Sequence, residues 1–182
     1  MLGNDVVDLR LAKTQSNWKR PNYLSKVFSS DEQNLIYSSG NTELMVWLMW
    51  SMKEAAYKIV NRNTGLRFYD PKAFCCSVDL DGWQAKGSVN YLGQQFLTYS
   101  DVGQYYVHTL SITSAISFEN CRIIHAQNCS DYVNCFNRDH TDLKLQRNNS
   151  GLPEICIMRT MKQHIATTSH HGSFLFIAYL LS

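Results

Sequence analysis

The sequence predicts an α+β fold built from one long, buried helix and a set of antiparallel strands. Residues 42–61 include an almost uninterrupted apolar segment, which is typical of a helix buried on most of its sides. From residue 67 to about residue 124, apolar and polar residues alternate with period two, as they do in half-buried strands. The chain has 182 residues, 45% of them hydrophobic, which suits one domain or two small halves that share a core.

The first forty residues predict one strand and one helix. Residues 2–11 are rich in valine and leucine and predict a short strand. Residues 21–40 predict a helix capped by Ser29 or Ser30, because two acidic residues follow in the first turn, where carboxylates favour the helix dipole. The sequence Ser-Ser-Gly at 38–40 ends this helix.

The long helix over 42–61 has clear start and stop signals. Asn41 or Thr42 caps its N-terminus, Glu43 lies in the first turn, and Gly65 follows shortly after the C-terminus.

The rest of the chain predicts strands, one short helix and a loop. Turn residues at 79–82, 92–93 and 101–103 separate the strands of an antiparallel meander. The four strand candidates are residues 74–80, 87–92, 94–100 and 105–113. Residues 130–137 predict a short helix, residues 138–151 a polar segment with a turn or loop at its end, and residues 165–182 a strand, a turn at His171-Gly172 and a second strand.

The net charge does not predict nucleic-acid binding. The formal charge is +2 and the isoelectric point is near 8.2, whereas nucleic-acid binding usually needs a concentrated basic patch. Basic residues do gather near the N-terminus, and two interpretations stay open: a solvated surface, or a docking face for an acidic partner or a phosphate. These residues are Arg10, Lys13, Lys19, Arg20 and Lys26.

The cysteines and the apolar segments predict a reduced, cytoplasmic protein. None of the six cysteines forms a CxxC pair, which argues against a structural zinc site. The N-terminus is acidic and has no apolar signal region, so a disulfide framework is not expected. The longest apolar run, residues 44–50, is too short to span a bilayer.

Glu54 and Lys58 are unusual because they lie within the apolar helix. They are four residues apart and therefore share one helix face with Trp50. One interpretation is an ordinary salt bridge on a solvated face. The apolar neighbours favour another: a partly buried carboxylate costs several kcal/mol unless a cation pairs with it, and that cation is Lys58 or a metal ion.

Two further groups are candidates for chemistry. Asp5 and Asp8 are three apart in the first strand and should point to opposite faces, either as two surface aspartates or with Asp5 in a site that Asp8 supports from the edge. Residues 167–173, TTSHHGS, combine serine and histidine before a glycine turn, and such groups bind phosphate oxygens. No P-loop, no Rossmann motif and no G-x-S-x-G motif occurs.

Together and in this order, these segments resemble the 4′-phosphopantetheinyl transferase superfamily. The family's Gly-x-Asp motif is similar to GNDVVD at 3–8, and its Trp-x-x-Lys-Glu-Ala-x-x-Lys motif is matched by WSMKEAAYK at 50–58. Phe-Ser and Glu within 28–32, Gly-Leu-Pro at 151–153 and Thr-Thr-Ser-His at 167–170 resemble the remaining motifs. Two positions depart from the pattern: Asp8 stands where the family often has glutamate, and Thr167 replaces a serine.

The resemblance implies a 4′-phosphopantetheinyl transferase-like fold, with antiparallel sheets packed on a long central helix. The motif order is that of the short carrier-protein synthases, which form trimers, but this chain is longer. The β-rich segment 67–124 resembles part of the longer, two-halved transferases. We therefore expect a pseudo-dimer: residues 1–118 form the first half, and residues 119–182 form a shortened second half that supplies Gly151–Pro153 and Ser169–His170. Such a chain is a monomer or a small homo-oligomer.

The resemblance also implies an activity, which is that of a holo-[acyl-carrier-protein] synthase. Phosphopantetheine passes from coenzyme A to a serine of an acyl or peptidyl carrier protein, as in fatty acid or polyketide biosynthesis. The resemblance implies that Asp5 and Glu54 bind Mg²⁺, or alternatively Mn²⁺, with Asp8 as a third ligand. Lys58 binds the pyrophosphate and contributes to catalysis. The catalytic base is Glu54 or a water on the metal, and Ser169 and His170 contact phosphate.

Three other interpretations stay open from the sequence alone. A non-catalytic relative would bind coenzyme A or a carrier protein without transferring a group. An unrelated hydrolase or metal-dependent phosphatase is supported only by scattered histidine and aspartate residues. A structural protein would carry the charged helix as a solvated face. In the absence of ligand, we expect Glu54 and Lys58 to pair with each other.

Overall fold

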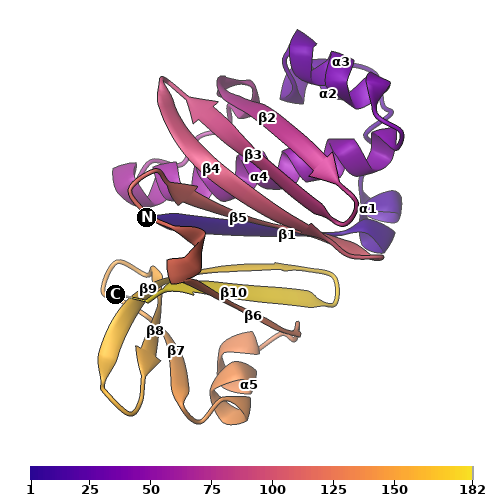
Figure 1. The fold of residues 1–182 in the computed structure, drawn as a ribbon. Coiled ribbons are helices and arrows are strands. Elements are labelled where there is room, and N and C mark those ends of the chain that lie inside the picture. Colours follow the sequence, from indigo (N-terminus) through magenta and orange to yellow (C-terminus); the bar gives the residue numbers. More distant parts are fainter. Residues whose placement is uncertain (182) are drawn as a thin grey trace.

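The computed structural model describes residues 1–181 and contains two five-stranded antiparallel sheets (Figure 1). The first sheet has the order β1-β5-β4-β3-β2, and the second has the order β6-β10-β9-β8-β7. The strands of the first sheet are β1 (Leu2–Asp8), β2 (Phe74–Asp81), β3 (Gln84–Tyr91), β4 (Gln94–Val102) and β5 (Tyr106–Thr113). Those of the second are β6 (Cys121–Gln127), β7 (Leu143–Arg147), β8 (Pro153–Ile157), β9 (Lys162–His171) and β10 (Phe174–Leu180).

The two sheets share one topology. In each sheet the strand that comes first in the sequence lies at one edge and pairs with the strand that comes last, and the remaining strands follow in reverse sequence order. The expected boundary near residue 119 falls in a short 3₁₀ helix, η2 (Phe118–Asn120), that lies between the two sheets in the sequence. This repeated topology agrees with two related halves, whereas the exact division into halves stays a prediction. The predicted α+β class with antiparallel sheets and a long helix is confirmed.

The long helix, α4 (Thr42–Thr64), extends three residues beyond its predicted end at residue 61 and packs across the first sheet (Figure 1). Asn41 caps its N-terminus, since its side chain accepts a hydrogen bond from the Leu44 amide at 3.1 Å. Gly65 ends the helix with φ of 70°, a left-handed conformation that glycine adopts without strain.

Two predictions for the first forty residues need correction. The strand predicted over 2–11 stops at Asp8, because the Asp8 side chain caps a new helix, α1 (Leu9–Gln15). The helix predicted over 21–40 is two helices, α2 (Tyr23–Val27) and α3 (Ser30–Ser38). Ser29 separates them by forming a capping box with Glu32, which starts α3 afresh.

The second half contains strands that the sequence pattern did not reveal. β6 and β8 were not among the strand candidates, and β7 lies in the segment predicted as a polar loop over 138–151. β7 is only five residues long and mostly polar, and it is defined by its pairing with β8. The predicted short helix is present as α5 (Tyr132–Asp139), and the predicted hairpin with its turn after His171 is β9–β10.

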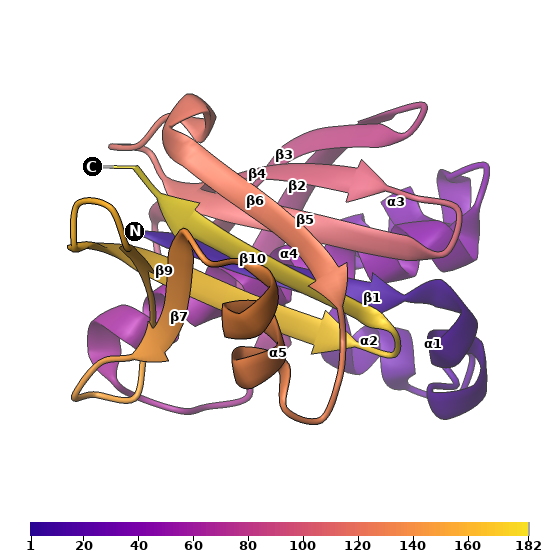
Figure 2. The same ribbon diagram turned by 90° about the horizontal axis from the view of Figure 1, so that it is seen from below.

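The two sheets meet at β1, which lies beside β9 and β10 (Figures 1 and 2). β1 is an edge strand of the first sheet, yet all seven of its residues are buried. α4 contacts β1 as well. The first strand of the chain is therefore covered by a helix from its own half and by strands from the other.

A buried ion pair connects α3, α4 and the start of β2. The Lys53 Nζ atom lies 2.8 Å from Glu32 Oε1, and both side chains are at most 3% exposed. Lys53 also donates to the carbonyl of Pro71 at 3.0 Å, and Glu32 accepts from the Cys76 amide at 2.7 Å. Because both the Lys53 ammonium and the Glu32 carboxylate form further hydrogen bonds besides their ion pair, the pair is a structural element of the core. The 3₁₀ helix η1 (Pro71–Ala73) supplies the Pro71 carbonyl.

We predict that Lys53→Met destabilises the fold by about 3–5 kcal/mol, because it leaves the Glu32 carboxylate buried without a cation. The double variant with Glu32→Gln should recover part of this loss, since no unpaired charge remains. Urea unfolding gives the free energies. Asp139→Asn, which removes an exposed ion pair with Arg138, is the control and should change stability by less than about 0.5 kcal/mol. A cost below about 1 kcal/mol for Lys53→Met would contradict the structural role.

Candidate active site

The candidate site is built on a close contact between β1 and α4. A Cβ atom at Gly3 would overlap the carbonyl oxygen of Ala55, so this contact requires glycine. The Ser51 hydroxyl of α4 donates to the Asp5 carbonyl at 3.2 Å. These contacts fix the register of β1 on α4 and bring Asp5 to the face of α4 that carries Lys58.

Asp5 is the centre of this site. Its Oδ1 atom lies 3.2 Å from Lys58 Nζ on α4 and accepts a hydrogen bond from the Ser169 hydroxyl on β9 at 3.1 Å. Lys58 also donates to the Asn4 carbonyl at 2.7 Å. The structure thus brings together three predicted site residues from three distant parts of the chain: Asp5, Lys58 and Ser169.

Glu54 lies one helical turn before Lys58 and is electrostatically coupled to Asp5. Burial, and then the negative charge of Asp5, raise the pKa of Glu54 from 4.5 to about 7, while the charge of Lys58 acts in the opposite direction. The expectation that Glu54 and Lys58 pair with each other is wrong, since within residues 1–181 the ion pair of Lys58 is with Asp5. Two carboxylates therefore share one lysine.

Glu54 also lines a pocket of about 240 Å³. The other lining residues are mostly aromatic, and the rings of Tyr57, Phe68 and Phe74 pack against one another. They include Tyr57, Phe68, Tyr69 and Phe74, together with Asp70 and Pro71. The carboxylate of Glu54 is thus only partly buried and is accessible to a ligand that enters this pocket.

Asp8 occupies a different environment from Asp5 and Glu54. Its Oδ1 atom accepts hydrogen bonds from the Arg10 and Leu11 amides at 3.0 and 3.2 Å, at the start of α1. A side chain at Gly172 would collide with this carboxylate. In the part of the chain that the structure describes, no three histidine, cysteine or acidic side chains are grouped closely enough to hold a metal ion. A metal-ligand role for Asp8 stays a prediction.

Ser169 and His170 do not form one binding turn, because they are consecutive residues of strand β9 and project from opposite faces. Ser169 is buried, and its hydroxyl accepts from the Val6 amide at 3.0 Å while it donates to Asp5. His170 is exposed, and its ring centre lies 5.5 Å from that of Tyr132. The two residues contact different parts of the molecule.

His171 is the contact residue that sequence analysis missed. Its Nδ1 atom accepts a hydrogen bond from the Asp8 amide at 2.9 Å. Ser169 and His171 therefore bind the amides of Val6 and Asp8, two residues apart on each strand. Because residues two apart in a strand lie on the same face, the period of two would have predicted His171, and not His170, on the face of Ser169.

The remaining predicted motif forms a turn. Gly151 has φ of 75°, and its carbonyl accepts from Arg147 at 2.8 Å, while Pro153 begins β8. Gly151–Pro153 thus closes the β7–β8 hairpin.

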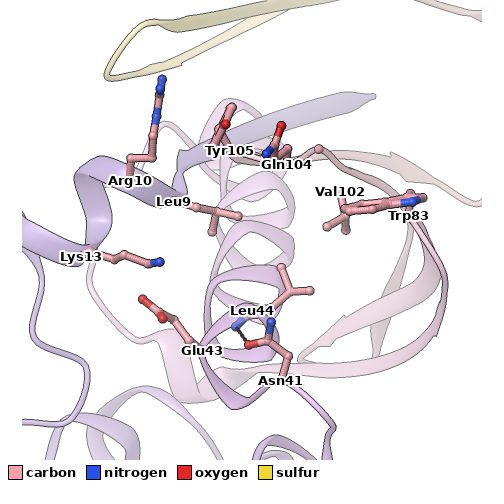
Figure 3. Close-up of a pocket in the computed structure, with 11 residues that line it drawn as sticks. Leu9, Arg10, Lys13, Asn41, Glu43, Leu44, Trp83, Val102, Gln104 and Tyr105 are labelled. Atoms are coloured by element: carbon pink, nitrogen blue, oxygen red, sulfur yellow. Dashed lines mark hydrogen bonds between the residues drawn. The ribbon is translucent and has the colours of Figure 1, made fainter.

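The basic residues near the N-terminus are distributed over two hollows. Arg10 and Lys13 line a pocket of about 420 Å³ between α1, the start of α4 and the β4–β5 turn, and the Arg10 guanidinium lies 4.4 Å from the centre of the Tyr105 ring. Figure 3 shows Lys13 and Glu43 pointing toward the space between their helices. Lys19 and Arg20 line a second pocket, of about 480 Å³.

We predict that Ser169→Ala lowers the free energy of unfolding by about 1–3 kcal/mol, because it leaves the buried Val6 amide without its side-chain partner and removes a buried hydrogen bond to Asp5, which keeps its contact with Lys58. Thr168→Ala, the next residue of β9 and on its opposite face, is the matched control and should cost clearly less. Chemical denaturation measures both. Equal losses for the two variants would show that the Ser169 hydroxyl has no special role.

We predict a pH-dependent gain of stability for Glu54→Gln. The folded-state pKa of Glu54 is about 7 and lies above the ordinary value of 4.5, so the folded state binds more protons between these pH values. Ionisation of Glu54 then costs stability as the pH rises from about 4.5 to about 7. With a chelator present, the variant should equal the wild type at pH 5 and exceed it by about 1–3 kcal/mol at pH 8. Parallel stability curves from pH 5 to 8 would contradict this coupling.

Comparisons with known proteins identify the family of this chain. Residues 1–111 match the model of the 4′-phosphopantetheinyl transferase superfamily, ACPS. No curated protein matches the chain significantly. One solved structure that matches is the crystal structure of the Thermotoga maritima holo-[acyl-carrier-protein] synthase, at 12% identity and a TM-score of 0.45, over 84% of this chain and 80% of that chain. None of the helices within residues 1–181 is long and apolar enough to cross a membrane. Because the family model covers more than half of the sequence, this chain belongs to the 4′-phosphopantetheinyl transferase superfamily.

Proposed function

We propose that this chain transfers the 4′-phosphopantetheinyl group of coenzyme A to a serine hydroxyl of an acyl or peptidyl carrier protein. Membership of the superfamily supports the reaction class. The observation that carries the proposal is the convergence on Asp5 of Lys58 from α4 and Ser169 from the second sheet, with Glu54 one turn away. In this reaction the serine oxygen attacks phosphorus, and the bond from that phosphorus to the leaving 3′,5′-ADP breaks.

The residues present fit a divalent cation. Asp5 and Glu54 offer carboxylate oxygens, which Mg²⁺ prefers, and Mg²⁺ is usually held by one or two carboxylates together with substrate phosphates. Burial, and then the repulsion from Asp5, raises the pKa of Glu54, and a cation would relieve this repulsion. We therefore assign Asp5 and Glu54 to Mg²⁺, with Mn²⁺ as the alternative. When bound, the ion supplies charge neutralisation of the pyrophosphate.

Asp8 is better assigned to positioning. Its Oδ1 atom holds the first amides of α1, and its own amide is bound by His171. These contacts fix the end of β1, and thereby the strand that carries Asp5.

Lys58 is suited to bind the pyrophosphate of coenzyme A. Its side chain is 31% exposed, so its ammonium group can be reached from solvent while it contacts Asp5. A lysine binds phosphate as a point charge, and the Asp5 contact holds that charge in place. We propose that Lys58 stabilises the negative charge that develops during transfer.

Glu54 is also suited to accept the proton of the serine hydroxyl. A general base works best when its pKa lies near the operating pH, and in the metal-free site the pKa of Glu54 is about 7, a value that a bound cation would lower. The aromatic pocket beside Glu54 is our candidate for the binding site of the acceptor segment. Ser169 acts through Asp5, and a phosphate contact by the exposed His170 stays a prediction.

A second candidate function is binding without transfer. Lys58 already neutralises Asp5. Within residues 1–181, no further carboxylate, histidine or cysteine joins Asp5 and Glu54 to form a group of three metal-binding side chains. Such a protein would bind coenzyme A or a carrier protein as a non-catalytic relative.

We predict that Glu54→Gln lowers the rate of Mg²⁺-dependent transfer by about 10²-fold or more, because it removes a charge needed for the cation and for proton acceptance. Mass spectrometry detects the phosphopantetheine added to an apo carrier protein in the presence of coenzyme A. Glu43→Gln, the same change near the start of the same helix, is the control and should keep the wild-type rate. Circular dichroism verifies that both variants are folded.

Two outcomes would change the proposal. If Glu54→Gln modifies the carrier protein at the wild-type rate, Glu54 has no part in the mechanism. If the wild type modifies none of several acyl and peptidyl carrier proteins, yet binds coenzyme A in calorimetry, the binding function replaces the transferase.

A further inference from the structure

Two cysteines of the second half lie side by side next to α5. The Sγ atoms of Cys129 and Cys135 are 2.7 Å apart, with both thiols in the free form. Cys129 follows β6 after one residue, and Cys135 lies in the first half of α5.

The backbone holds both cysteines in place. The amide of Asn128 donates to the Ser173 carbonyl at 3.0 Å, and its side chain donates to the Gly172 carbonyl at 2.9 Å, which ties the residue before Cys129 to the β9–β10 turn. The Cys135 amide donates to the Asp131 carbonyl at 3.0 Å within the first turn of α5. The short distance between the sulfurs is therefore a consequence of the fold.

The surroundings of the pair favour thiol chemistry. Both cysteines are partly exposed, so a small reagent can reach them. The hydrogen bond with Cys129 raises the pKa of the Cys135 thiol, whereas the nearby guanidinium of Arg138 favours its thiolate. The net effect is a raised pKa of Cys135, so the closeness of the two sulfurs, and not an acidic thiol, favours the bond between them.

We propose that Cys129 and Cys135 are a redox modification site, at which a small disulfide such as glutathione disulfide forms a reversible intramolecular bond. One cysteine thiolate attacks glutathione disulfide and releases one glutathione as thiolate. The second cysteine thiolate then attacks the mixed disulfide and releases the other glutathione. The two cysteines are oxidised, one glutathione disulfide is reduced to two glutathione molecules, and the two thiol protons pass to solvent or to the released thiolates.

The bond would fix a residue that touches the second sheet. Tyr132 lies between the two cysteines in the sequence, and its ring contacts that of His170 on β9. α5 is only eight residues long, and no side chain caps its N-terminus. Oxidation is expected to hold the start of α5, and Tyr132 with it, against β9.

Peptide mapping of the full chain tests the proposal directly. Trypsin cleaves after Arg122 and Arg138, so both cysteines fall on one peptide, residues 123–138. The protein is incubated with excess glutathione disulfide, quenched with acid, unfolded, and treated with N-ethylmaleimide. We expect this peptide to carry no maleimide and to have lost two hydrogens, and dithiothreitol to restore two maleimides. The peptide of residues 73–86, with the free cysteines Cys75 and Cys76, is the internal control for complete alkylation and should carry two maleimides.

Variants distinguish this bond from other oxidation. Cys135→Ser should abolish the loss of two hydrogens from the peptide, and Cys75→Ser should leave it unchanged. Hydrogen exchange in α5 should slow on oxidation in the wild type but not in Cys135→Ser. The proposal is overturned if the 123–138 peptide stays doubly alkylated, if it retains glutathione as a stable mixed disulfide, or if a non-reducing gel shows that it links two chains.

Discussion

The arrangement of this molecule depends on how the outer edge of β1 is covered. An edge strand presents unpaired amides, and in β1 those of Val6 and Asp8 are bound by Ser169 and His171 of β9. On the other side, Gly3 lets the backbone of β1 lie against Ala55 of α4. The strand is therefore fixed between the two halves without a backbone ladder to the second sheet, and side chains decide its position. The Ser169 hydroxyl accepts from the Val6 amide and at the same time donates to Asp5. The contact between β1 and β9 that holds the two halves together is therefore also part of the candidate site.

The charges where β1, α4 and β9 meet are unbalanced, because the carboxylates of Asp5 and Glu54 lie near one lysine, Lys58. Asp5 and Glu54 are both at least partly buried, and Lys58 lies next to Asp5. The other lysine of the motif, Lys53, points into the core and is neutralised by Glu32, so it does not offset the second carboxylate. In the folded protein without ligand, Glu54 therefore keeps its proton up to a higher pH than an ordinary glutamate does. A divalent cation together with a polyanion would satisfy the same groups, since the cation is shared by the carboxylates and the anion by Lys58.

Much of this could be predicted from the sequence, and the failures have physical causes. The helix over 42–61, with Glu54 and Lys58 on one face, follows from its apolar pattern and its caps. Pairing Asp5 with that face required the family resemblance, because no local signal connects distant segments. β1 ends earlier than predicted, at Asp8, because the Asp8 side chain accepts hydrogen bonds from two amides of α1 and caps that helix. This local hydrogen bonding outweighs the strand propensity of the residues that follow. The family resemblance points to His170, because Thr-Thr-Ser-His ends there, whereas in strand β9 the face alternates with each residue and His171 shares the face of Ser169. β7 depends on pairing with β8, and such tertiary pairing leaves little trace in five polar residues.

The repeated strand order raises the question of whether the second half carries a similar site, and its sequence argues that it does not. β6 stands in the second sheet where β1 stands in the first, yet it contains no acidic residue. α5 follows β6 as the helices of the first half follow β1, but it has eight residues where α4 has 23, and its one carboxylate, Asp139, is exposed and paired with Arg138. The second half therefore positions Asp5 through Ser169 of β9, and it also contacts β1 through β10, where the Phe176 carbonyl accepts a hydrogen bond from the Asn4 side chain at 3.0 Å. In the proposed function both halves form one site, and the second half, whose strand β6 has no acidic residue, also carries the thiol pair beside α5.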